Sequence, residues 1–399
     1  MRLGIDASNI RDGGGLGHVS GLLHGAEPQR HGITKIIVWG GRTTLDRLPE
    51  RPWLEHRHDP LLDKSLPFRT YWQARVLPRL AQENCDCLFV PGGVFRGNFR
   101  PVVVQSQNML PFEWVELRRY GFSALAAKLL LLRFAQRRSF RRADGAIFLT
   151  NYSRSVVQQV TGIAGDFPLI PYGLSRTFFR PPRPQKPLSE YSLDHPFKLL
   201  YVSKLEPYKH QWQVVEAIAQ LRREGLPVTL NLVGAPERPA LHQRLQETMR
   251  RVDADGQFIH YAGHVGFEEL VQIYHQADGF IFASSCENLP NIMLEAMGAG
   301  LPIACAERGP MPEALGDAGL YFDPEQPTSI ATAVRALVQD QHWREQAAHR
   351  AYERAQTYSW ERCARETLTY ISEVVARSFP HNVAAASEPL SLEGLSNKA

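Results

Sequence analysis

Short apolar segments alternate with amphipathic segments of helical period along almost the whole chain, and this alternation constrains the fold most. Six segments in the first half have the length and composition of strands: 2–6, 36–40, 87–91, 101–107, 146–150 and 168–171. Six more follow in the second half: 198–203, 228–234, 258–264, 279–284, 302–306 and 320–323. Helical patterns separate them, for example at 211–224, 240–252 and 268–277. The pattern therefore predicts parallel sheets covered by helices.

A proline-rich segment separates the two sets of strands. Residues 178–196 read FFRPPRPQKPLSEYSLDHP, and proline lacks the backbone N–H that regular structure needs. We therefore predict a linker at 178–196 between an amino-terminal domain (1–177) and a carboxyl-terminal domain (197–357). A chain of 399 residues also exceeds what one hydrophobic core usually organises. The expected architecture is α/β, with two doubly wound, Rossmann-like domains facing across a cleft.

Composition excludes several classes of protein. Hydrophobic residues make up 44% of the chain and charged residues 22%, as in soluble globular proteins. The formal charge of +4 is too small to indicate a nucleic-acid partner. The five cysteines lack paired zinc-type spacing, and an odd count without a recognisable secretion signal favours a cytoplasmic location. The longest apolar stretch, near 122–135, is too short to span a membrane.

Two glutamates stand eight positions apart around an expected helix start. The segment 284–302 reads SSCENLPNIMLEAMGAGLP, and Asn288 is expected to cap a helix over 291–297. Glu287 then lies in the preceding loop and Glu295 about one turn inside the helix. With a rise of ~1.5 Å per residue the carboxylates could lie on the order of 10 Å apart, with the anion-attracting helix start between them. Solvated surface glutamates are the alternative, but this layout suits a nucleotide sugar.

The segment 284–302 resembles the E-x7-E signature of retaining family-4 glycosyltransferases, which have the GT-B fold. The continuation AERGPMPEALGDAGLYFDP (306–324) is similar to the same family, and the resemblance extends from residue 1 to about 378. It implies a GT-B fold and a nucleoside diphosphate sugar as donor. It also implies that the last helix, about 358–378, crosses back to the first domain, with Trp360 at the crossing.

The resemblance assigns roles to the residues of the signature. Glu287 would orient the sugar near its reacting carbon, and Glu295 would bind the ribose hydroxyls. Asn288 and Leu289 would offer backbone N–H groups to the phosphate and the sugar.

Two lysines follow the first strand of the second half, in SKLEPYK (203–209). Lys204 and Lys209 are expected at the carboxyl end of that strand, where fixed cations stabilise charge that develops on a departing diphosphate. Solvated lysines are the alternative. The segment resembles the family's G-R-x4-K element, with Ser203 at the glycine position and Lys204 at the arginine position. Because lysine lacks the bidentate fork of arginine, Lys209 is the firmer assignment. No metal or other cofactor is implied.

A glycine-rich segment, RDGGGLGHVSGLL (11–23), follows the first strand. It does not fit a dinucleotide-binding fingerprint, because the count places a histidine or a serine at the last glycine position. We expect a loop facing the cleft, with backbone N–H groups near phosphate or sugar. The resemblance implies that Gly14, Gly15 and Gly17 approach the donor. His18 would either contact substrate or cap the following helix.

The acceptor side offers fewer signals. Many family members carry a histidine after the strand that corresponds to 102–107, whereas this chain has Gln107 and Asn108 there. Histidine catalysis is therefore not expected, and in the front-face mechanism the leaving phosphate itself takes the acceptor proton. Gln107 could hydrogen-bond the sugar or could simply be satisfied at the strand end. Tyr172, at another strand end, is a candidate acceptor contact or hinge residue.

The segment 118–142 carries eight basic residues and no acidic one. A solvated basic face over a leucine stripe is one interpretation. The other is docking on an anionic membrane surface, where each basic residue contributes on the order of 1 kcal/mol, as in family members with lipid-linked acceptors. The polar segment 380–399 is predicted to be disordered.

Together these patterns predict a retaining glycosyltransferase that moves a hexose from a nucleoside diphosphate sugar to a saccharide or lipid-linked acceptor. Synthesis of cell-surface polysaccharide or lipopolysaccharide, at the inner face of the membrane, is the expected setting. A sugar-nucleotide epimerase of similar fold and a donor-binding scaffold without turnover remain alternatives.

Overall fold

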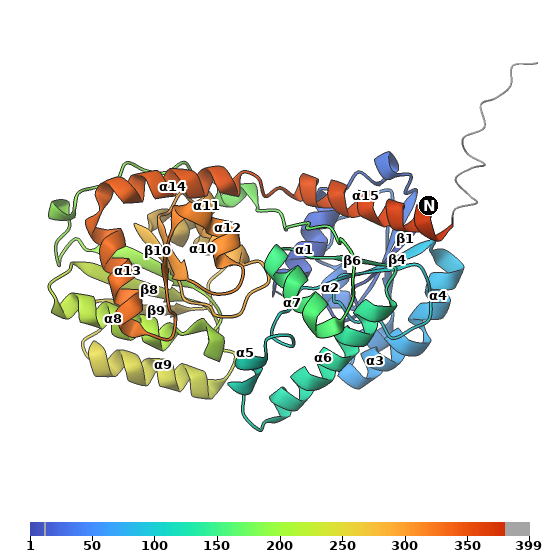
Figure 1. Ribbon diagram of the computed structural model, residues 1–399, viewed down its shortest axis with the longest axis horizontal. Coiled ribbons are helices and arrows are strands. Elements are labelled where there is room, and N and C mark those ends of the chain that lie inside the picture. Colours follow the sequence, from blue (N-terminus) through green and yellow to red (C-terminus); the bar gives the residue numbers. More distant parts are fainter. Residues whose placement is uncertain (12, 380–399) are drawn as a thin grey trace, which may run out of the picture.

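A computed structural model describes residues 1–11 and 13–379 and shows two lobes, each built on a parallel six-stranded sheet (Figure 1). The amino-terminal sheet has the order β3-β2-β1-β4-β5-β6 and the carboxyl-terminal sheet the order β12-β11-β10-β7-β8-β9. In each sheet the chain starts near the middle, builds outward on one side and then crosses to build the other. The predicted fold class, two doubly wound α/β domains, is confirmed. The predicted tail at 380–399 lies outside the described residues.

The bounds of the strands follow the apolar runs of the sequence. The amino-terminal sheet contains β1 (Arg2–Asp6), β2 (Lys35–Gly40), β3 (Leu54–His58), β4 (Cys87–Val90), β5 (Val102–Gln105) and β6 (Gly145–Ile147). The carboxyl-terminal sheet contains β7 (Phe197–Val202), β8 (Val228–Val233), β9 (Ile259–Gly263), β10 (Gly279–Phe282), β11 (Ile303–Ala306) and β12 (Gly319–Phe322). The central strands are buried on both faces, which explains their continuous apolar sequences.

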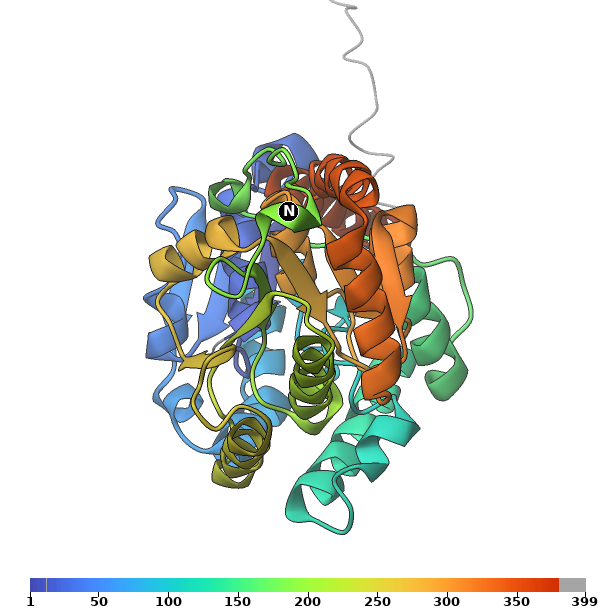
Figure 2. The same ribbon diagram turned by 90° about the vertical axis from the view of Figure 1, so that its left-hand side faces the viewer.

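Helices cover both faces of each sheet (Figure 2). Those of the amino-terminal lobe are α1 (Gly13–His24), α2 (Arg42–Leu45), α3 (Leu66–Arg75), α4 (Leu77–Asn84), α5 (Trp114–Arg118), α6 (Ala124–Arg142) and α7 (Asn151–Thr161). Those of the carboxyl-terminal lobe are α8 (Gln211–Arg223), α9 (Pro239–Val252), α10 (Phe267–Gln276), α11 (Asn291–Gly298), α12 (Met311–Leu315), α13 (Pro327–Gln339) and α14 (Gln341–Ala355). The last helix is α15 (Trp360–Ser378). Short 3-10 helices are η1 (Pro28–His31), η2 (Pro60–Asp63), η3 (Arg176–Phe178), η4 (Leu188–Glu190), η5 (Pro207–Lys209) and η6 (Gly316–Ala318).

One predicted strand is wrong and one strand was missed. Residues 168–171 form no strand and contribute only one isolated bridge, between Phe148 and Leu169. The edge strand β3 was not predicted, because its sequence LEHRH lacks an apolar run. It is held by parallel pairing with β2, and Glu55 forms an ion pair with Lys35 of that strand. Partial exposure at a sheet edge lets a polar sequence form a strand.

The last helix, α15, crosses from the carboxyl-terminal lobe and packs beside α1 of the amino-terminal lobe (Figure 1). Trp360, its first residue, lies against three glycines. A Cβ on Gly21 would lie 2.4 Å from the Trp360 ring, and Cβ atoms on Gly25 and Gly173 would lie 2.6 Å and 2.3 Å from Trp360 backbone atoms. The contact therefore exists because these three positions have no side chain.

The proline-rich linker is fastened to the carboxyl-terminal lobe by a buried arginine. Arg344 of α14 lies 2.5 Å from the carbonyl oxygen of Lys186 and 3.3 Å from Oε1 of Gln185, both in the linker. It also donates a hydrogen bond of 3.0 Å to the carbonyl of Leu337 in α13. Because these acceptors surround a fully buried guanidinium, they satisfy the donors that burial would otherwise leave unpaired.

Candidate functional site

The centre of the candidate site is an ion pair between Lys209 and Glu287. Lys209 ends η5, just after β7, and Glu287 lies in the loop after β10, so the two residues come from neighbouring strands. Their side chains are only 9% and 16% exposed, and Nζ of Lys209 contacts Oε1 of Glu287. The ammonium also lies 5.1 Å from the centroid of the Phe282 ring and 5.3 Å from that of Tyr208. The pair lies at the carboxyl ends of β7 and β10, where the order of strands in the sheet switches sides. This switch point is the usual place for a ligand in such a fold.

A backbone arrangement that the sequence did not predict holds Lys209 in place. The hydroxyl of Tyr201 donates a hydrogen bond to the carbonyl of Lys209, and Ser285 donates its N–H to the carbonyl of Tyr208 at 2.8 Å. The next residue, His210, has a φ of 50° and lies with Nε2 2.9 Å from the hydroxyl of Ser285. Burial lowers the pKa of His210 to about 4, so this ring is neutral near pH 7.

Glu295 lies inside α11, as predicted, and borders a cavity between the two lobes. The cavity has a volume of about 610 Å³ and is lined from α1 and α11, by Gly17 and Glu295 among others. One carboxylate oxygen, Oε2, is 2.9 Å from the hydroxyl of Tyr274 on α10. Burial raises the pKa of Glu295 to about 7. The volume lies within the range of small-ligand sites, and a carboxylate at its wall can accept hydrogen bonds from hydroxyl groups.

Asn288 does not cap α11, so that prediction is wrong. The residue before the helix is Pro290, and its side chain makes no capping hydrogen bond. Asn288 instead donates Nδ2–H to the carbonyl of Ser106 at 2.7 Å and accepts a hydrogen bond of 3.1 Å from the hydroxyl of Thr150 at its own carbonyl. Because both partners belong to the amino-terminal lobe, the side chain and the backbone carbonyl of Asn288 together tie the loop of Glu287 to that lobe.

Backbone donors remain open at the start of α11. Within the described part of the chain, the N–H groups of Asn288 and Leu289 donate to no backbone or side-chain acceptor. Leu289 itself is buried. Unpaired N–H groups beside a helix start are suited to bind phosphate oxygens.

The glycine segment is not a loop, contrary to the prediction, but the first turns of α1. A Cβ on Gly14 would lie 3.7 Å from Nδ2 of Asn291, and a Cβ on Gly15 would lie 3.0 Å from Oε1 of Gln107. Glycine is a poor helix former, but any larger residue at position 15 would push the side chain of Gln107 away. Gly14 therefore lies close to α11 and Gly15 close to Gln107. Gly17 lines the cavity beside Glu295.

His18 and Gln107, both predicted to lie on the acceptor side, contact each other. Nδ1 of His18 is 2.8 Å from Nε2 of Gln107, and burial lowers the pKa of His18 to about 3. The ring is therefore a neutral acceptor for the Gln107 amide. His18 lies in the second turn of α1, so the predicted helix cap is wrong. Tyr172 is buried with its ring 4.7 Å from that of His18, whereas Asn108 is exposed and accepts the N–H of Leu110 at 3.0 Å.

Lys204 has a different environment from Lys209. Its Nζ is 2.7 Å from Oε1 of Glu237, and its side chain is 55% exposed. The structure thus pairs Lys204 with a carboxylate near the surface and Lys209 with Glu287 in the interior.

Further contacts between the lobes were not predicted from the sequence. Glu313 of α12 accepts hydrogen bonds from the N–H groups of Asn151 at 2.7 Å and Tyr152 at 3.0 Å, at the start of α7. Arg119, just after α5, forms an ion pair of 2.7 Å with Glu325. A carboxylate at a helix start is stabilised by the unpaired N–H groups there. Nothing local in the sequence marks these pairs, because their members are more than 150 positions apart.

Across residues 1–11 and 13–379, no group of three or more His, Cys, Asp or Glu side chains is arranged to hold a metal ion. Over the same residues, no helix has the length and apolar character needed to cross a membrane. The five cysteines are buried free thiols.

A protein-family model matches most of the carboxyl-terminal lobe. Residues 196–340 match the family model for glycosyl transferases group 1. The chain is 32% identical over 184 residues to O-antigen chain mannosyltransferase B of Escherichia coli. The matched region makes up 45% of this chain and 47% of that protein. The chain is 26% identical over 225 residues to D-inositol 3-phosphate glycosyltransferase of Frankia alni, covering 54% and 53%. The chain spans about half the length of these curated relatives.

Solved structures share the fold over almost the whole chain. The Anabaena protein Alr3699/HepE, solved with UDP and glucose, has a TM-score of 0.67 at 18% identity and covers 94% of this chain and all of that one. Sucrose-phosphate synthase from Thermosynechococcus elongatus has a TM-score of 0.71 at 18% identity, covering 97% and 100%. WaaG, described as a glycosyltransferase involved in lipopolysaccharide biosynthesis, has a TM-score of 0.66 at 15% identity, covering 93% and 99%. These likenesses show the GT-B fold.

Proposed function

Because residues 196–340 match the glycosyl transferases group 1 model within a GT-B fold, we propose that this protein is a retaining glycosyltransferase. It moves a hexose from a nucleoside diphosphate sugar to a saccharide or lipid-linked acceptor. The observation that carries the proposal is the buried pair of Lys209 and Glu287. The pair lies beside the open backbone N–H groups of Asn288 and Leu289. Glu287 precedes Glu295, which borders the cavity between the lobes, by eight positions.

The donor would lie along the start of α11. The diphosphate is bound by the N–H groups of Asn288 and Leu289 and by the ammonium of Lys209, and the helix dipole favours the same anion. The ribose hydroxyls donate hydrogen bonds to Glu295, whose other neighbour, Tyr274, fixes the carboxylate. The structures of a fold neighbour solved with UDP and with UDP-glucose support a nucleotide sugar as the donor class.

The chemical step needs a cation more than it needs an acid or a base. The bond between the anomeric carbon and the leaving phosphate breaks, and the acceptor oxygen bonds to that carbon on the same face. The acceptor proton passes to the leaving phosphate oxygen. Lys209 stabilises the charge that develops on the diphosphate, Glu287 orients the sugar, and Gln107, held by His18, lies on the acceptor side. Lys204 would add a second positive charge near the diphosphate once its ion pair with Glu237 has broken.

We further propose a role in the synthesis of cell-surface polysaccharide or lipopolysaccharide, on the cytoplasmic face of a membrane. The relative named O-antigen chain mannosyltransferase B and the fold neighbour WaaG support this setting. The segment of α5 and α6 projects from the molecule in two views (Figures 1 and 2). Phe122, Leu131 and Phe134 are exposed there among basic residues. Such a surface can contact anionic lipid.

One experiment tests the proposed activity against its alternatives. The full chain is incubated with a panel of radiolabelled nucleotide sugars, and the products are identified by mass spectrometry. Transfer or hydrolysis supports a glycosyltransferase. A changed sugar on an intact nucleotide would indicate an epimerase, and binding without turnover would indicate a scaffold. A Glu287→Gln protein that turns over as fast as the wild type would exclude the proposed site, whereas a Glu247→Gln protein, altered on the exposed face of α9, serves as the matched control.

A further inference from the structure

A groove lies between α3 and α6 on the amino-terminal lobe, lined by residues that take no part in the donor site. Its volume is about 650 Å³, within the range of small-ligand sites. The apolar part of the lining includes Leu66, Tyr71, Phe95 and Ala135. Leu66 and Tyr71 are exposed to solvent. Exposed apolar side chains that gather around a groove mark a surface suited to bind an apolar ligand.

Three arginines line the same groove from three different elements. Arg75 ends α3, Arg96 follows β4, and Arg138 lies in α6. Their guanidinium groups form no hydrogen bond or ion pair with another described residue. Among the described residues, no acidic side chain lines the groove. Because arginine matches phosphate through paired N–H groups, three unpaired arginines favour a ligand with more than one phosphate charge.

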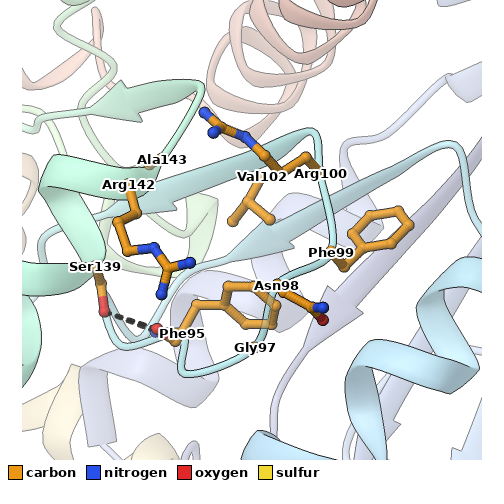
Figure 3. Close-up of a pocket in the computed structure, with 9 residues that line it drawn as sticks. All are labelled: Phe95, Gly97, Asn98, Phe99, Arg100, Val102, Ser139, Arg142 and Ala143. Carbon is orange, nitrogen blue, oxygen red and sulfur yellow. Dashed lines mark hydrogen bonds between the residues drawn. The ribbon is translucent and has the colours of Figure 1, made fainter.

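The groove is held in shape by hydrogen bonds on both sides. Nε2 of Gln73, on α3, donates to the carbonyl of Val94 at 2.6 Å. The hydroxyl of Ser139, on α6, accepts the N–H of Phe95 at 2.9 Å and lies 3.1 Å from its carbonyl (Figure 3). The segment that carries Phe95 and Arg96 is thus tied to both flanking helices. A preformed site loses less entropy when a ligand binds.

The walls of the groove are connected to the carboxyl ends of the central strands of the sheet. Gln73 also donates to Oδ2 of Asp6 at 2.5 Å, and Asp6 ends β1. The segment with Phe95 follows β4, which pairs with β1. Ligands of doubly wound folds lie outside the carboxyl ends of such strands. A ligand in the groove could therefore extend to an acceptor saccharide near α1.

We propose that this groove binds the diphosphate and the first isoprenyl units of a lipid-linked saccharide acceptor. The proposal rests on the proposed glycosyltransferase activity and names its acceptor class. Arg75, Arg96 and Arg138 bind the diphosphate, and the hydrocarbon lies along Leu66 and Tyr71. Phe68 on α3 and Phe134 on α6 are exposed and stand next in sequence to the lining residues Pro67 and Ala135. The hydrocarbon beyond the groove would contact these two rings.

Farnesyl diphosphate is the probe, titrated into the full chain by calorimetry with a saturating nucleoside diphosphate present to fill the donor site. We expect saturable binding, with farnesol and inorganic diphosphate each at least tenfold weaker. Arg75→Ala with Arg138→Ala should weaken binding at least tenfold, and Arg138→Glu alone should do the same. Arg223→Ala, at an exposed arginine of α8 in the other lobe, should leave binding unchanged.

Three results would overturn the proposal. Farnesyl diphosphate does not bind, or it binds equally well to the groove variants, or farnesol binds as tightly. Association only with vesicles of phosphatidylglycerol, lost in the groove variants, would show a membrane-docking surface and not an acceptor site. A wild-type protein that binds no nucleotide sugar would instead refute the proposed function, so the two failures are distinguishable.

Discussion

Replacing Lys209 by methionine should separate the structural role of the Lys209–Glu287 pair from its catalytic role. Methionine keeps most of the volume of the lysine side chain but removes the charge. Glu287 would then lie largely buried, at 16% exposure, without its cationic partner. Removing one member of a buried ion pair typically costs about 3–5 kcal/mol. Because some solvent reaches both side chains, we expect a loss of about 2–4 kcal/mol in unfolding free energy.

The same substitution should lower activity by a different mechanism. Loss of one group that stabilises developing charge typically lowers kcat by about 10²–10³-fold. In the double variant Lys209→Met, Glu287→Gln, no buried charge is left, so most of the lost stability should return. Activity should not return, since the cation for the diphosphate is still missing.

Both quantities are measured on purified protein. Thermal unfolding should show a drop in Tm of about 5–15 °C for the single variant, since 1 kcal/mol corresponds to roughly 2–4 °C in a domain of this size, and a near-wild-type Tm for the double variant. Donor turnover should be low in both. A double variant that regains activity together with stability would refute the catalytic role of Lys209 and leave only a structural one.

Three further predictions concern pH, packing and the linker. Burial raises the pKa of Glu295 from 4.5 to about 7, so the folded protein holds a proton that the unfolded chain has lost. Wild-type unfolding free energy should therefore fall as pH rises from about 4.5 to about 7, and thermal scans of Glu295→Gln should lack this fall. Gly21→Ala places a Cβ 2.4 Å from the Trp360 ring and should cost about 1–3 kcal/mol in urea unfolding. Gly17→Ala, where a Cβ would meet no described atom within 4 Å, should be neutral or slightly stabilising, and equal effects would contradict the packing argument. Arg344→Met leaves buried carbonyl groups unpaired and should cost about 2–4 kcal/mol; an unchanged urea midpoint would show that the linker is held by other contacts.

The fold was predictable because most strands are continuous apolar runs bounded by turns. Strands such as β4 and β10 are buried along their whole length, so composition alone marks them. The exception, β3, is an edge strand with a polar sequence. Its formation depends on pairing with β2, which no local pattern reveals.

The candidate site was predictable only where residues lie close together in the sequence. The positions of Glu287 and Glu295 relative to α11 follow from helix geometry and are as predicted. The partner of Glu287 is 78 positions away. The position after a strand and the family resemblance pointed to Lys209, but neither predicted its pairing with Glu287. The bond of Asn288 to Ser106 spans 182 positions. Asn288 does not form the helix cap that the sequence suggested, because the cap position before α11 is occupied by Pro290, two residues further along the chain.

The glycine segment shows a further limit of local reasoning. Three successive glycines favour a loop by propensity, yet α1 begins at Gly13. The approach of Gln107 to Gly15 and of Asn291 to Gly14 supplies tertiary contacts that override the propensity. Such contacts become visible only when both lobes are in place.

The central claim is that this chain transfers a hexose with retention at the site of Lys209 and Glu287. The most direct test follows donor hydrolysis by proton NMR, with water as the acceptor, so that no acceptor need be known. For a donor with an α-linked sugar, the α-anomer of the free sugar should appear first, together with the nucleoside diphosphate, and Glu287→Gln should slow its release. Initial release of the β-anomer, or no turnover of any donor in the panel, would contradict the account.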